Sequence, residues 1–469
     1  MQQKFSRVTI SSSAVLLVHR LILVIRIALF IPLRITTPLS WQLKNRKKFE
    51  DKNLSDPASC SFKMSGLQAD VTFHISSEGE LEQVRPLIDY YLQKGNRLEI
   101  IYSSPSVEHR CQQIYSTHLA QIRLLRLPLL SYFPVSWWGG QSLADWISSN
   151  KLIMCRYDFY SELLLFMQRS TITTILVSAT LKGKIHKLQK REYWWWRVYW
   201  RGIYSQFSRI IVATPQDEEY FYQLGITTHP LQNFDFRIIQ VASRIMNSAS
   251  TIKKTPMQSL IEYLEQSIPH EQRVLVGSAW PIEMDILASR PLVEQIIAGN
   301  LQLTIAPHNL SSESITTIIN SIRTYLGPEN PIYIFTPQMS EQEQHSVIQQ
   351  LQDRPGPVIT TVPAILCELY IYYGHVLVGG GHGRSIHSLL EPYLAGANLF
   401  CGPKTFRSTE YDIVKKHSSP FITVVDSLPD FYHLLKPILI RNSDRAFRQE
   451  LICQHQEKFP LIAAEFLGE

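Results

Sequence analysis

The sequence predicts an α/β fold in which two Rossmann-like domains face a cleft, preceded by a membrane-associated helix. Strand-like and helix-like stretches alternate over residues 71–225, and a second alternating series starts near residue 270, as expected for parallel sheets covered by helices. The only long apolar stretch lies among basic residues at the N-terminus. The predicted parts are an N-terminal basic and apolar helix over 1–53, a first Rossmann-like domain over 54–240, a connector over 241–270, a second Rossmann-like domain over 271–445 and a C-terminal helix over 446–469.

Composition excludes several other classes of protein. The chain has 469 residues, enough for two or three domains of about 150 residues each. Hydrophobic residues make up 45% and charged residues 18%, which excludes a disordered protein. The six cysteines are dispersed without a CxxC pair, a pattern that argues against a disulfide scaffold or a zinc ribbon and fits a reducing compartment. No metal motif stands in a suitable context, so we expect neither a metal nor another cofactor.

The N-terminal segment combines positive charge with an apolar stretch. Residues 1–53 hold ten Lys or Arg and two acidic residues, a formal +8, so the other 416 residues carry about −2 of the net +6. The apolar stretch 14–33 contains His19 and two arginines, which are costly at the centre of a bilayer. We therefore expect a helix that lies in an anionic membrane surface rather than spanning it. The alternative is an amphipathic helix packed on the protein. The slightly acidic remainder argues against a nucleic-acid partner.

Each element of the two domains follows from local patterns of apolar residues and helix-ending signals. In the first domain we expect strands at 71–75, 97–102, 151–155, 174–177 and 210–213, and helices at 81–92, 143–148, 162–168 and 217–224. In the second we expect strands at 274–277, 302–306, 332–335, 375–378 and 399–402, and a helix at 386–395. The polar, proline-containing segment 49–67 predicts a linker.

Candidate nucleotide-binding residues lie in the stretch 376–391, where a strand ends at three glycines and a helix is expected to begin near Ser385. Glycine lets the backbone approach a ligand, and a helix N-terminus favours phosphate. The candidates in this stretch are Gly380, Gly381, Ser385 and Glu391, the last for ribose hydroxyls. Turns after two other strands, at Ser278 and His308, are expected at the same sheet edge. A tight turn without a ligand is the alternative.

Two carboxylates follow strands of the first domain. Glu80 starts the helix after the strand 71–75, and at the carboxyl edge of a sheet it is well placed as a general base. The alternative is an acid that complements the helix dipole. Glu78 lies nearby, and its like charge would raise the pKa of Glu80. Asp158 follows the strand 151–155 and is a second candidate, with an exposed loop position as its alternative.

A basic and aromatic segment lies within residues 182–200. Its candidate acceptor- or membrane-binding residues are Lys182, Lys184, Lys187, Arg191, Trp194 and Trp195. This composition suits a phosphorylated amphiphile at a membrane surface, which is the interpretation we favour. Stacking on single-stranded nucleic acid and a place in the protein core are the alternatives.

Several of these segments, in this order, resemble the Kdo (3-deoxy-manno-octulosonate) transferases of lipopolysaccharide assembly. The variety found in Bacteroidetes-type bacteria is most similar, and the likeness runs from about residue 40 to the C-terminal helix. Ser77-Glu-Gly-Glu80 is similar to the SxGE segment of the family, whose second acid is the catalytic base. The stretch 156–160 is similar to an acidic family motif, with Asp158 in place of Glu. The other matching stretches are 176–179, 277–281, 306–308, 379–391 and 401–404.

The resemblance implies a GT-B glycosyltransferase at the cytoplasmic side of the inner membrane. The C-terminal half would bind CMP-Kdo and the N-terminal half a lipid A precursor (lipid IVA). Glu80 would deprotonate a sugar hydroxyl that attacks the anomeric carbon, with inversion and without a metal. The helix N-terminus near Ser385, with His308 and His387, would stabilise the departing phosphate. Ser388, the last donor-site candidate, stands where Asn is usual in the family, as Ala279 stands for Thr.

One segment departs from the family pattern. The family places Lys or Arg before the connector, where this chain has Phe234 and Asp235, and only Arg237 is close enough to replace the missing charge. Arg237 is therefore a third candidate catalytic residue, and Arg237→Ala is expected to abolish transfer. Two alternative functions are a GT-B transferase that uses another nucleotide sugar on a lipid acceptor and a degenerate, non-catalytic membrane scaffold.

Overall fold

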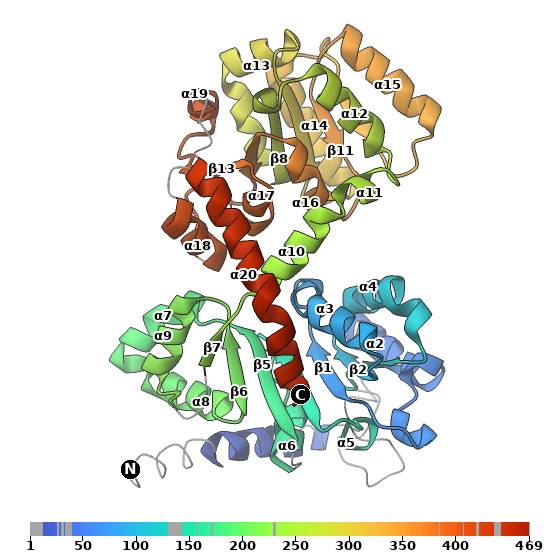
Figure 1. The fold of residues 1–469 in the computed structure, drawn as a ribbon, viewed down its shortest axis with the longest axis vertical. Helices are drawn as coiled ribbons and strands as arrows, with labels where there is room; N and C mark the ends of the chain where they lie inside the picture. The colour runs from blue at the N-terminus through green and yellow to red at the C-terminus, as the bar shows by residue number, and fades with distance from the viewer. Residues whose placement is uncertain are drawn as a thin grey trace. The chain divides into compact units, whose positions relative to one another are not determined.

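The computed structural model describes residues 13–25, 28–29, 32, 40–129, 143–156, 158–169, 172–227, 231–383, 385–406, 408–418, 422–435 and 442–468. The chain forms two compact units, the first made of Met1–Gln240 with Glu457–Glu469 and the second of Val241–Gln456. Each is a parallel β-sheet with helices on its faces (Figure 1). The predicted α/β fold with two Rossmann-like domains is confirmed.

Among its described residues, the first unit has a seven-stranded parallel sheet in the order β3-β2-β1-β4-β5-β6-β7. Its strands are β1 (Val71–Ile75), β2 (Leu98–Tyr102), β3 (Ile122–Arg126), β4 (Lys151–Cys155), β5 (Thr173–Ala179), β6 (Arg209–Val212) and β7 (Leu231–Asn233). Its helices are α2 (Trp41–Asp51), α3 (Glu78–Gln93), α4 (Pro105–Tyr115), α5 (Leu143–Trp146), α6 (Ser161–Arg169), α7 (Ile185–Gln189), α8 (Trp194–Tyr204) and α9 (Pro215–Leu224). The strand order reverses between β1 and β4, which is where open α/β sheets bind ligands.

The second unit, as far as it is described, has a seven-stranded parallel sheet in the order β10-β11-β9-β8-β12-β13-β14. Its strands are β8 (Arg273–Ala279), β9 (Gln302–Pro307), β10 (Tyr333–Phe335), β11 (Val358–Thr360), β12 (His375–Val378), β13 (Asn398–Cys401) and β14 (Ile422–Val424). Its helices are α11 (Ser248–Ile252), α12 (Met257–Ser267), α13 (Arg290–Ile297), α14 (Ser312–Leu326), α15 (Glu341–Asp353), α16 (Leu366–Leu369), α17 (Leu390–Leu394), α18 (Thr409–Ser418) and α19 (Phe431–Leu434). The corresponding reversal lies between β8 and β12.

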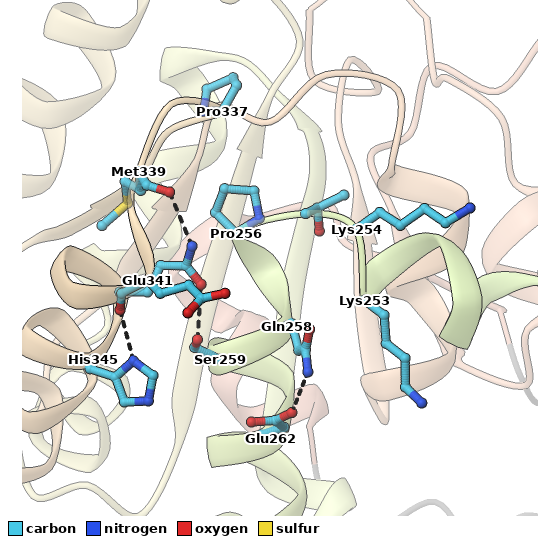
Figure 2. A pocket seen from close by; sticks show the side chains of 12 residues that line it. Lys253, Lys254, Pro256, Gln258, Ser259, Glu262, Pro337, Met339, Glu341 and His345 are labelled. Carbon is cyan, nitrogen blue, oxygen red and sulfur yellow. Dashed lines mark hydrogen bonds between the residues drawn. The ribbon is translucent and has the colours of Figure 1, made fainter.

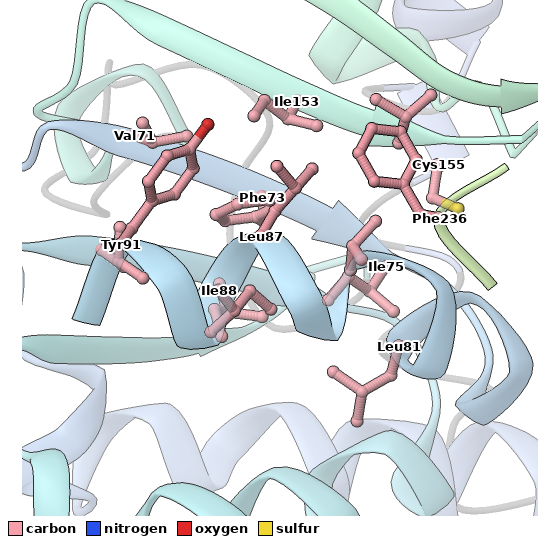
Figure 3. Close-up of a cluster of buried hydrophobic side chains, with 14 of the residues drawn as sticks. Val71, Phe73, Ile75, Leu81, Leu87, Ile88, Tyr91, Ile153, Cys155 and Phe236 are labelled. Carbon is pink, nitrogen blue, oxygen red and sulfur yellow. The ribbon is translucent and has the colours of Figure 1, made fainter. Parts of the chain in front are cut away.

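The core of the first unit covers β1 along its whole length. All five residues of β1 are buried, as expected for a parallel strand covered on both faces. Val71, Phe73 and Ile75 share one face of the strand and pack in the same cluster as Leu87 and Tyr91 of α3 (Figure 3). This packing fixes the start of α3, and with it Glu80, at the carboxyl end of β1.

Two helices cross the boundary between the units along the chain: α10 (Phe236–Met246) and α20 (Asn442–Leu467). The end of α20 belongs to the core of the first unit through Phe459, Ile462, Ala463 and Phe466. The hydroxyl of Tyr91 donates to the carbonyl oxygen of Ala463 at 3.0 Å. The segment 241–270, predicted as a connector, clusters with the second unit.

The prediction of a linker at 49–67 was wrong. The segment continues α2 and then forms three short 3-10 helices, Lys52–Leu54, Pro57–Ser59 and Phe62–Ser65. It supplies partners to the buried guanidinium of Arg126 on β3, which donates to Asp56 Oδ2 at 2.9 Å and to Ser59 Oγ at 3.2 Å. A buried charge must be paired. The ion pair and hydrogen bond to Arg126 therefore hold in place a segment whose polar composition predicted a linker.

The described part of the N-terminal segment is helical over residues 13–25. His19 attaches this helix to the first unit: its Nδ1 lies 2.9 Å from Ser161 Oγ of α6 and its Nε2 lies 3.1 Å from Tyr199 Oη of α8. Val15, Leu16 and Leu23 are buried, whereas Leu17, Leu21, Val24 and Ile25 are more than half exposed. Arg26 lies outside the described residues. Within the described part of the chain, no helix is both long enough and apolar enough to cross a membrane.

Candidate active site

Glu80 lies at the start of α3, directly after β1. Ser77 caps the helix, and its Oγ accepts from the Glu80 backbone N–H at 3.3 Å. The Glu80 side chain turns back to the strand end, where its Oε2 accepts from the Ser76 N–H at 2.7 Å. Glu80 is only 4% exposed, whereas Glu78 is exposed. Of the two neighbouring acids, the structure therefore places Glu80 alone in a buried position at the strand end.

Burial raises the pKa of Glu80 to about 7. The hydrogen bond from Ser76 lowers this pKa, the charge of Asp158 raises it and that of Arg156 lowers it. The like charge that we expected from Glu78 thus comes from Asp158 on the next strand end. A carboxyl group with a pKa near 7 is suited to general-base chemistry at neutral pH.

Two further groups define the end of β4. Arg156 has a left-handed backbone, with φ 60°, and its Nε donates to Gln83 Oε1 at 3.0 Å. Asp158 is exposed, and its charge acts on both Glu80 and Lys184. The structure therefore brings Glu80, Asp158 and Lys184 into one electrostatic neighbourhood. Gln83, which orients Arg156, was missed by the sequence analysis; it is buried one turn after Glu80 on α3.

Arg237 forms a two-pronged ion pair with Asp235. Its Nε donates to Asp235 Oδ1 at 2.9 Å and its Nη2 to Asp235 Oδ2 at 2.6 Å. The Arg237 charge also reaches the thiol of Cys155, at the end of β4. The guanidinium is thus in the same part of the first unit as Glu80, and the carboxylate of Asp235 compensates its charge.

The basic and aromatic segment divides into an inward and an outward part. Lys184 Nζ lies 4.3 Å from the ring centre of Trp200, and Lys187 Nζ lies 5.8 Å from that of Trp196. Trp196 is buried in the core, so the core interpretation holds for this residue. Trp194 and Trp195 are 62% and 55% exposed. Lys182 is half-buried and Arg191 is exposed.

In the second unit, three aromatic rings from three loops are stacked. Trp280 follows β8, His308 follows β9 and His387 follows the glycine run after β12. The His308 and His387 ring centres are 4.2 Å apart, and those of Trp280 and His308 are 4.7 Å apart. Trp280 Nε1 donates to His387 Nε2 at 3.2 Å, which places the imidazole proton of neutral His387 on Nδ1.

Desolvation lowers the pKa of both stacked histidines. The pKa of His387 falls to about 4, with a further lowering by His308, and the pKa of His308 is lowered as well. Neutral His387 therefore offers a hydrogen bond rather than positive charge to an anion. The sequence analysis anticipated the two histidines but not Trp280, which completes the stack.

Glu283 joins the loop after β8 to the glycine run. Its buried carboxylate accepts from the Trp280 N–H at 2.8 Å and from the Gly380 N–H at 3.0 Å. Gly380 has φ 89°, and a Cβ there would meet the carbonyl oxygen of Ser385, so only glycine fits. Ser278 has a left-handed backbone with φ 52°. Sequence analysis missed Glu283, although proline at the first helical position and Glu two residues later form a helix-start signal.

The expected helix start near Ser385 was wrong. The helix after the glycine run is the short α17, which begins at Leu390. The side chain of Glu410 accepts hydrogen bonds at the start of this helix. Its Oε2 accepts from the Leu389 N–H at 2.7 Å, from the Leu390 N–H at 3.0 Å and from Ser388 Oγ at 3.0 Å. These donors are therefore satisfied by the protein. No local signal could have indicated Glu410, because it lies 20 residues from Leu390.

The remaining donor-site candidates are close to the glycine run. Gly381 packs against Gly402, and a Cβ at Gly381 would overlap that residue. Glu391 is the second residue of the short helix α17, whereas the sequence predicted it more than one turn inside a longer helix. Its charge raises the pKa of Arg244 and of Tyr370. Contact of Glu391 with a ribose stays a prediction.

A pocket in the second unit lies apart from these residues. It is formed by the turn before α12 and the start of α15, and Figure 2 shows Lys253, Lys254, Glu262 and His345 around it. Its wall is held by the hydrogen bond from Ser259 Oγ to Gln344 Oε1 at 2.9 Å. None of the predicted site residues lines this pocket. In the described part of the chain, no group of three His, Cys, Asp or Glu is arranged to hold a metal ion.

Comparison with solved structures defines the class of fold. The structure of UGT89C1 from Arabidopsis thaliana complexed with UDP is similar over 85% of this chain and 100% of that one, with 13% identity and a TM-score of 0.51. Its complex with quercetin is similar over 86% and 100%, with 14% identity and a TM-score of 0.50. The C-terminal CMP-Kdo binding domain of WaaA from Acinetobacter baumannii matches 46% of this chain and 97% of that domain, with 16% identity and a TM-score of 0.30. The two UGT89C1 matches show that this chain shares the GT-B fold of two parallel-sheet α/β domains.

A family model matches the N-terminal part of the chain. Residues 42–236 are similar to the family described as 3-deoxy-D-manno-octulosonic-acid transferase (kdotransferase). The matched residues include Glu80, Asp158 and the basic and aromatic segment, but end before Arg237. No curated protein sequence matches the chain.

Proposed function

We propose that this protein transfers Kdo from CMP-Kdo to a lipid A precursor, with Glu80 as the general base. One observation carries the proposal: within residues similar to the Kdo transferase family, Glu80 is a buried carboxyl group at the sheet's ligand-binding edge, with a pKa of about 7. A group with this pKa is about half ionised at neutral pH and accepts a proton readily.

The proposed reaction is a single displacement. The Glu80 carboxylate takes the proton of an acceptor hydroxyl while the hydroxyl oxygen forms a bond to the anomeric carbon of Kdo. The bond from that carbon to the CMP phosphate breaks on the opposite side, and its electron pair leaves with CMP, so the configuration inverts. Glu80 then releases its proton to water. In the second unit, the stack of Trp280, His308 and His387, with Gly380, Gly381 and Ser278, is the proposed CMP site.

We further propose that the protein works at the cytoplasmic face of the inner membrane, lying on the lipid surface. The observations that support this are the exposed apolar side of the helix over 13–25 and the exposed Trp194 and Trp195 on α8. The two elements are neighbours, because His19 of the first lies 3.1 Å from Tyr199 of the second. Basic residues before α8 would face anionic headgroups. A lipid acceptor would then reach the first unit from the bilayer.

The proposal is tested by incubating the purified protein in detergent with a lipid A precursor and CMP-Kdo generated in situ. Products are measured by mass spectrometry. We expect a mass gain of one or more Kdo units, unchanged by a metal chelator and lost in Glu80→Ala. A wild-type protein that binds the acceptor but forms no product would refute the proposed activity.

A second candidate is transfer from a different nucleotide sugar. The pairing of Arg237 with Asp235 favours it, because Asp235 stands in a segment where the family that the sequence resembles places Lys or Arg. Protection of the protein against thermal unfolding separates the two: protection by CMP and not by UDP supports CMP-Kdo, and the reverse supports the second candidate. Protection by neither would favour a non-catalytic scaffold.

A further inference from the structure

Two buried hydroxyl groups at the carboxyl edge of the first sheet lack a strong hydrogen-bond partner among the described residues. Ser76 follows the last residue of β1 and is 9% exposed, and Ser178 lies near the end of β5 and is 2% exposed. Within the described part of the chain, neither hydroxyl has a protein oxygen or nitrogen partner that meets hydrogen-bond geometry. Burying an unpaired hydroxyl is unfavourable, so each such group in a folded protein requires an explanation.

The backbone of Ser178 is also unusual. Its φ is 55°, in the left-handed region that residues with a Cβ rarely adopt. The pairing of β5 with β6 shifts in register between Leu176 and Ala179, around this residue. The neighbouring Arg156 is left-handed as well, and its N–H donates to the Val177 carbonyl oxygen at 3.0 Å. Such strain persists where the fold enforces it and is concentrated at functional sites.

Both serines belong to the surroundings of Glu80. β4 lies between β1 and β5 in the sheet, and Ser76 itself donates its backbone N–H to Glu80. The pKa of the Cys155 thiol, at the end of β4, is raised by the charge of Glu80 and lowered by a hydrogen bond with the Ser178 side chain. A thiol is only a weak hydrogen-bonding group, so Cys155 does not replace a strong partner for Ser178.

We infer that the hydroxyls of Ser178 and Ser76 bind hydroxyl groups of the acceptor sugar next to the hydroxyl that Glu80 deprotonates. This inference rests on the proposed function. A polyhydroxylated ring supplies both donors and acceptors, which a serine hydroxyl can match. The sugar of the donor has the same chemistry; we assign the contacts to the acceptor because the two serines and Glu80 belong to the same unit.

The test compares Ser178→Ala and Ser76→Ala with Ser149→Ala in the transfer assay and in thermal unfolding. Ser149 is an equally buried control whose hydroxyl does have partners, at 2.6 Å from Thr72 Oγ1 and 2.7 Å from the Lys151 carbonyl oxygen. We expect Ser178→Ala and Ser76→Ala each to raise the KM for the acceptor about three- to tenfold, the equivalent of one lost hydrogen bond. Their kcat and melting temperature should change little. Ser149→Ala should lower the melting temperature and leave the KM unchanged.

A second variant separates the hydroxyl of Ser178 from its backbone. Ser178→Gly also removes the hydroxyl but fits the left-handed conformation without strain, so we expect the same rise in KM with a higher melting temperature than that of Ser178→Ala. The inference is overturned if the acceptor KM stays within twofold in Ser178→Ala and Ser76→Ala. It is also overturned if only the donor KM rises, or if both variants melt early as Ser149→Ala does. A wild-type protein that transfers no Kdo would instead refute the proposed function, and this inference with it.

Discussion

The carboxylate of Asp235 holds the guanidinium of Arg237 through hydrogen bonds of 2.9 Å and 2.6 Å. Asp235 is 4% exposed, so its charge has little access to water. The Kdo transferases that this sequence resembles have Lys or Arg in this segment. In this chain the positive charge is that of Arg237, and Asp235 is its counter-ion. The pair therefore determines both the stability of the segment and the charge that it can offer to a substrate.

Arg237→Ala should destabilise the protein because it leaves the Asp235 carboxylate buried without its main counter-ion. Loss of one partner of a buried pair costs about 3 kcal/mol of unfolding free energy. Urea denaturation of Arg237→Ala, Asp235→Ala and the double variant measures this effect. We expect the double variant to be more stable than Arg237→Ala; a loss in the double variant equal to the sum of the two single losses would show that the pair is not coupled.

Transfer should depend on pH through Glu80. A general base must be ionised, and the pKa of Glu80 is about 7, so kcat/KM should fall tenfold per pH unit below pH 7 and level off above it. The profile is measured from pH 5 to pH 9 at low substrate concentrations. In Asp158→Asn the midpoint should move down, because the charge of Asp158 raises the pKa of Glu80. A rate that is constant from pH 5 to pH 9 would contradict this role.

Glu80→Gln should lose activity and gain stability at alkaline pH. The folded protein holds the Glu80 proton up to a pKa of about 7, whereas the unfolded chain releases it near 4.5. The free energy of unfolding from this group therefore declines as pH rises between those values, by about 3 kcal/mol in total. Glu80→Gln removes this decline, so it should exceed the wild type in melting temperature at pH 8 by more than it does at pH 4. Glu78→Gln is the matched control, because Glu78 is exposed and its replacement should leave the pH dependence unchanged.

The sequence predicted the features that depend on neighbouring residues along the chain. The alternation of strands and helices gave both sheets, and the bounds of β1, β4 and β12 agree with the expected ranges. Glu80 could be placed because it follows β1 within five residues. Glu410 could not, since it reaches the start of α17 only through the folding of the second unit. The helix start near Ser385 failed for a local reason: glycine followed by polar residues suits a loop as well as a helix.

The neutral state of His387 should depend on Trp280. The hydrogen bond from Trp280 Nε1 holds His387 Nε2 unprotonated, and the His387 ring is partly desolvated within the stack. Trp280→Phe removes the hydrogen bond, and Trp280→Ala also opens the stack. We expect the pKa of His387, about 4 in the wild type, to rise by at least about one unit in Trp280→Ala and by less in Trp280→Phe. NMR titration of labelled histidines measures this, with the exposed His345 as an internal reference. An unchanged His387 pKa in Trp280→Ala would show that the stack does not set it.

Binding to anionic vesicles should require the exposed side of the N-terminal helix. Leu17 and Leu21 are 64% and 61% exposed and lie one turn apart. Each leucine that enters the lipid contributes about 1.5–3 kcal/mol, so Leu17→Glu and Leu21→Glu should each weaken vesicle binding about tenfold or more. Trp194→Ala should weaken it as well, since Tyr199 of the same helix contacts His19 of the N-terminal helix.

The matched controls are Leu461→Glu and Met246→Glu, at apolar residues 71% and 76% exposed on α20 and α10. They introduce the same charge on other helices and should leave binding to the vesicles unchanged. The basic residues predict in addition that binding weakens as salt concentration rises. Equal losses in all four glutamate variants would mean that added negative charge alone repels the vesicles. Apolar contacts are insensitive to salt. Residual vesicle binding that persists at high salt and is lost in Leu17→Glu would therefore show that the helix contacts the lipid chains and not only the headgroups.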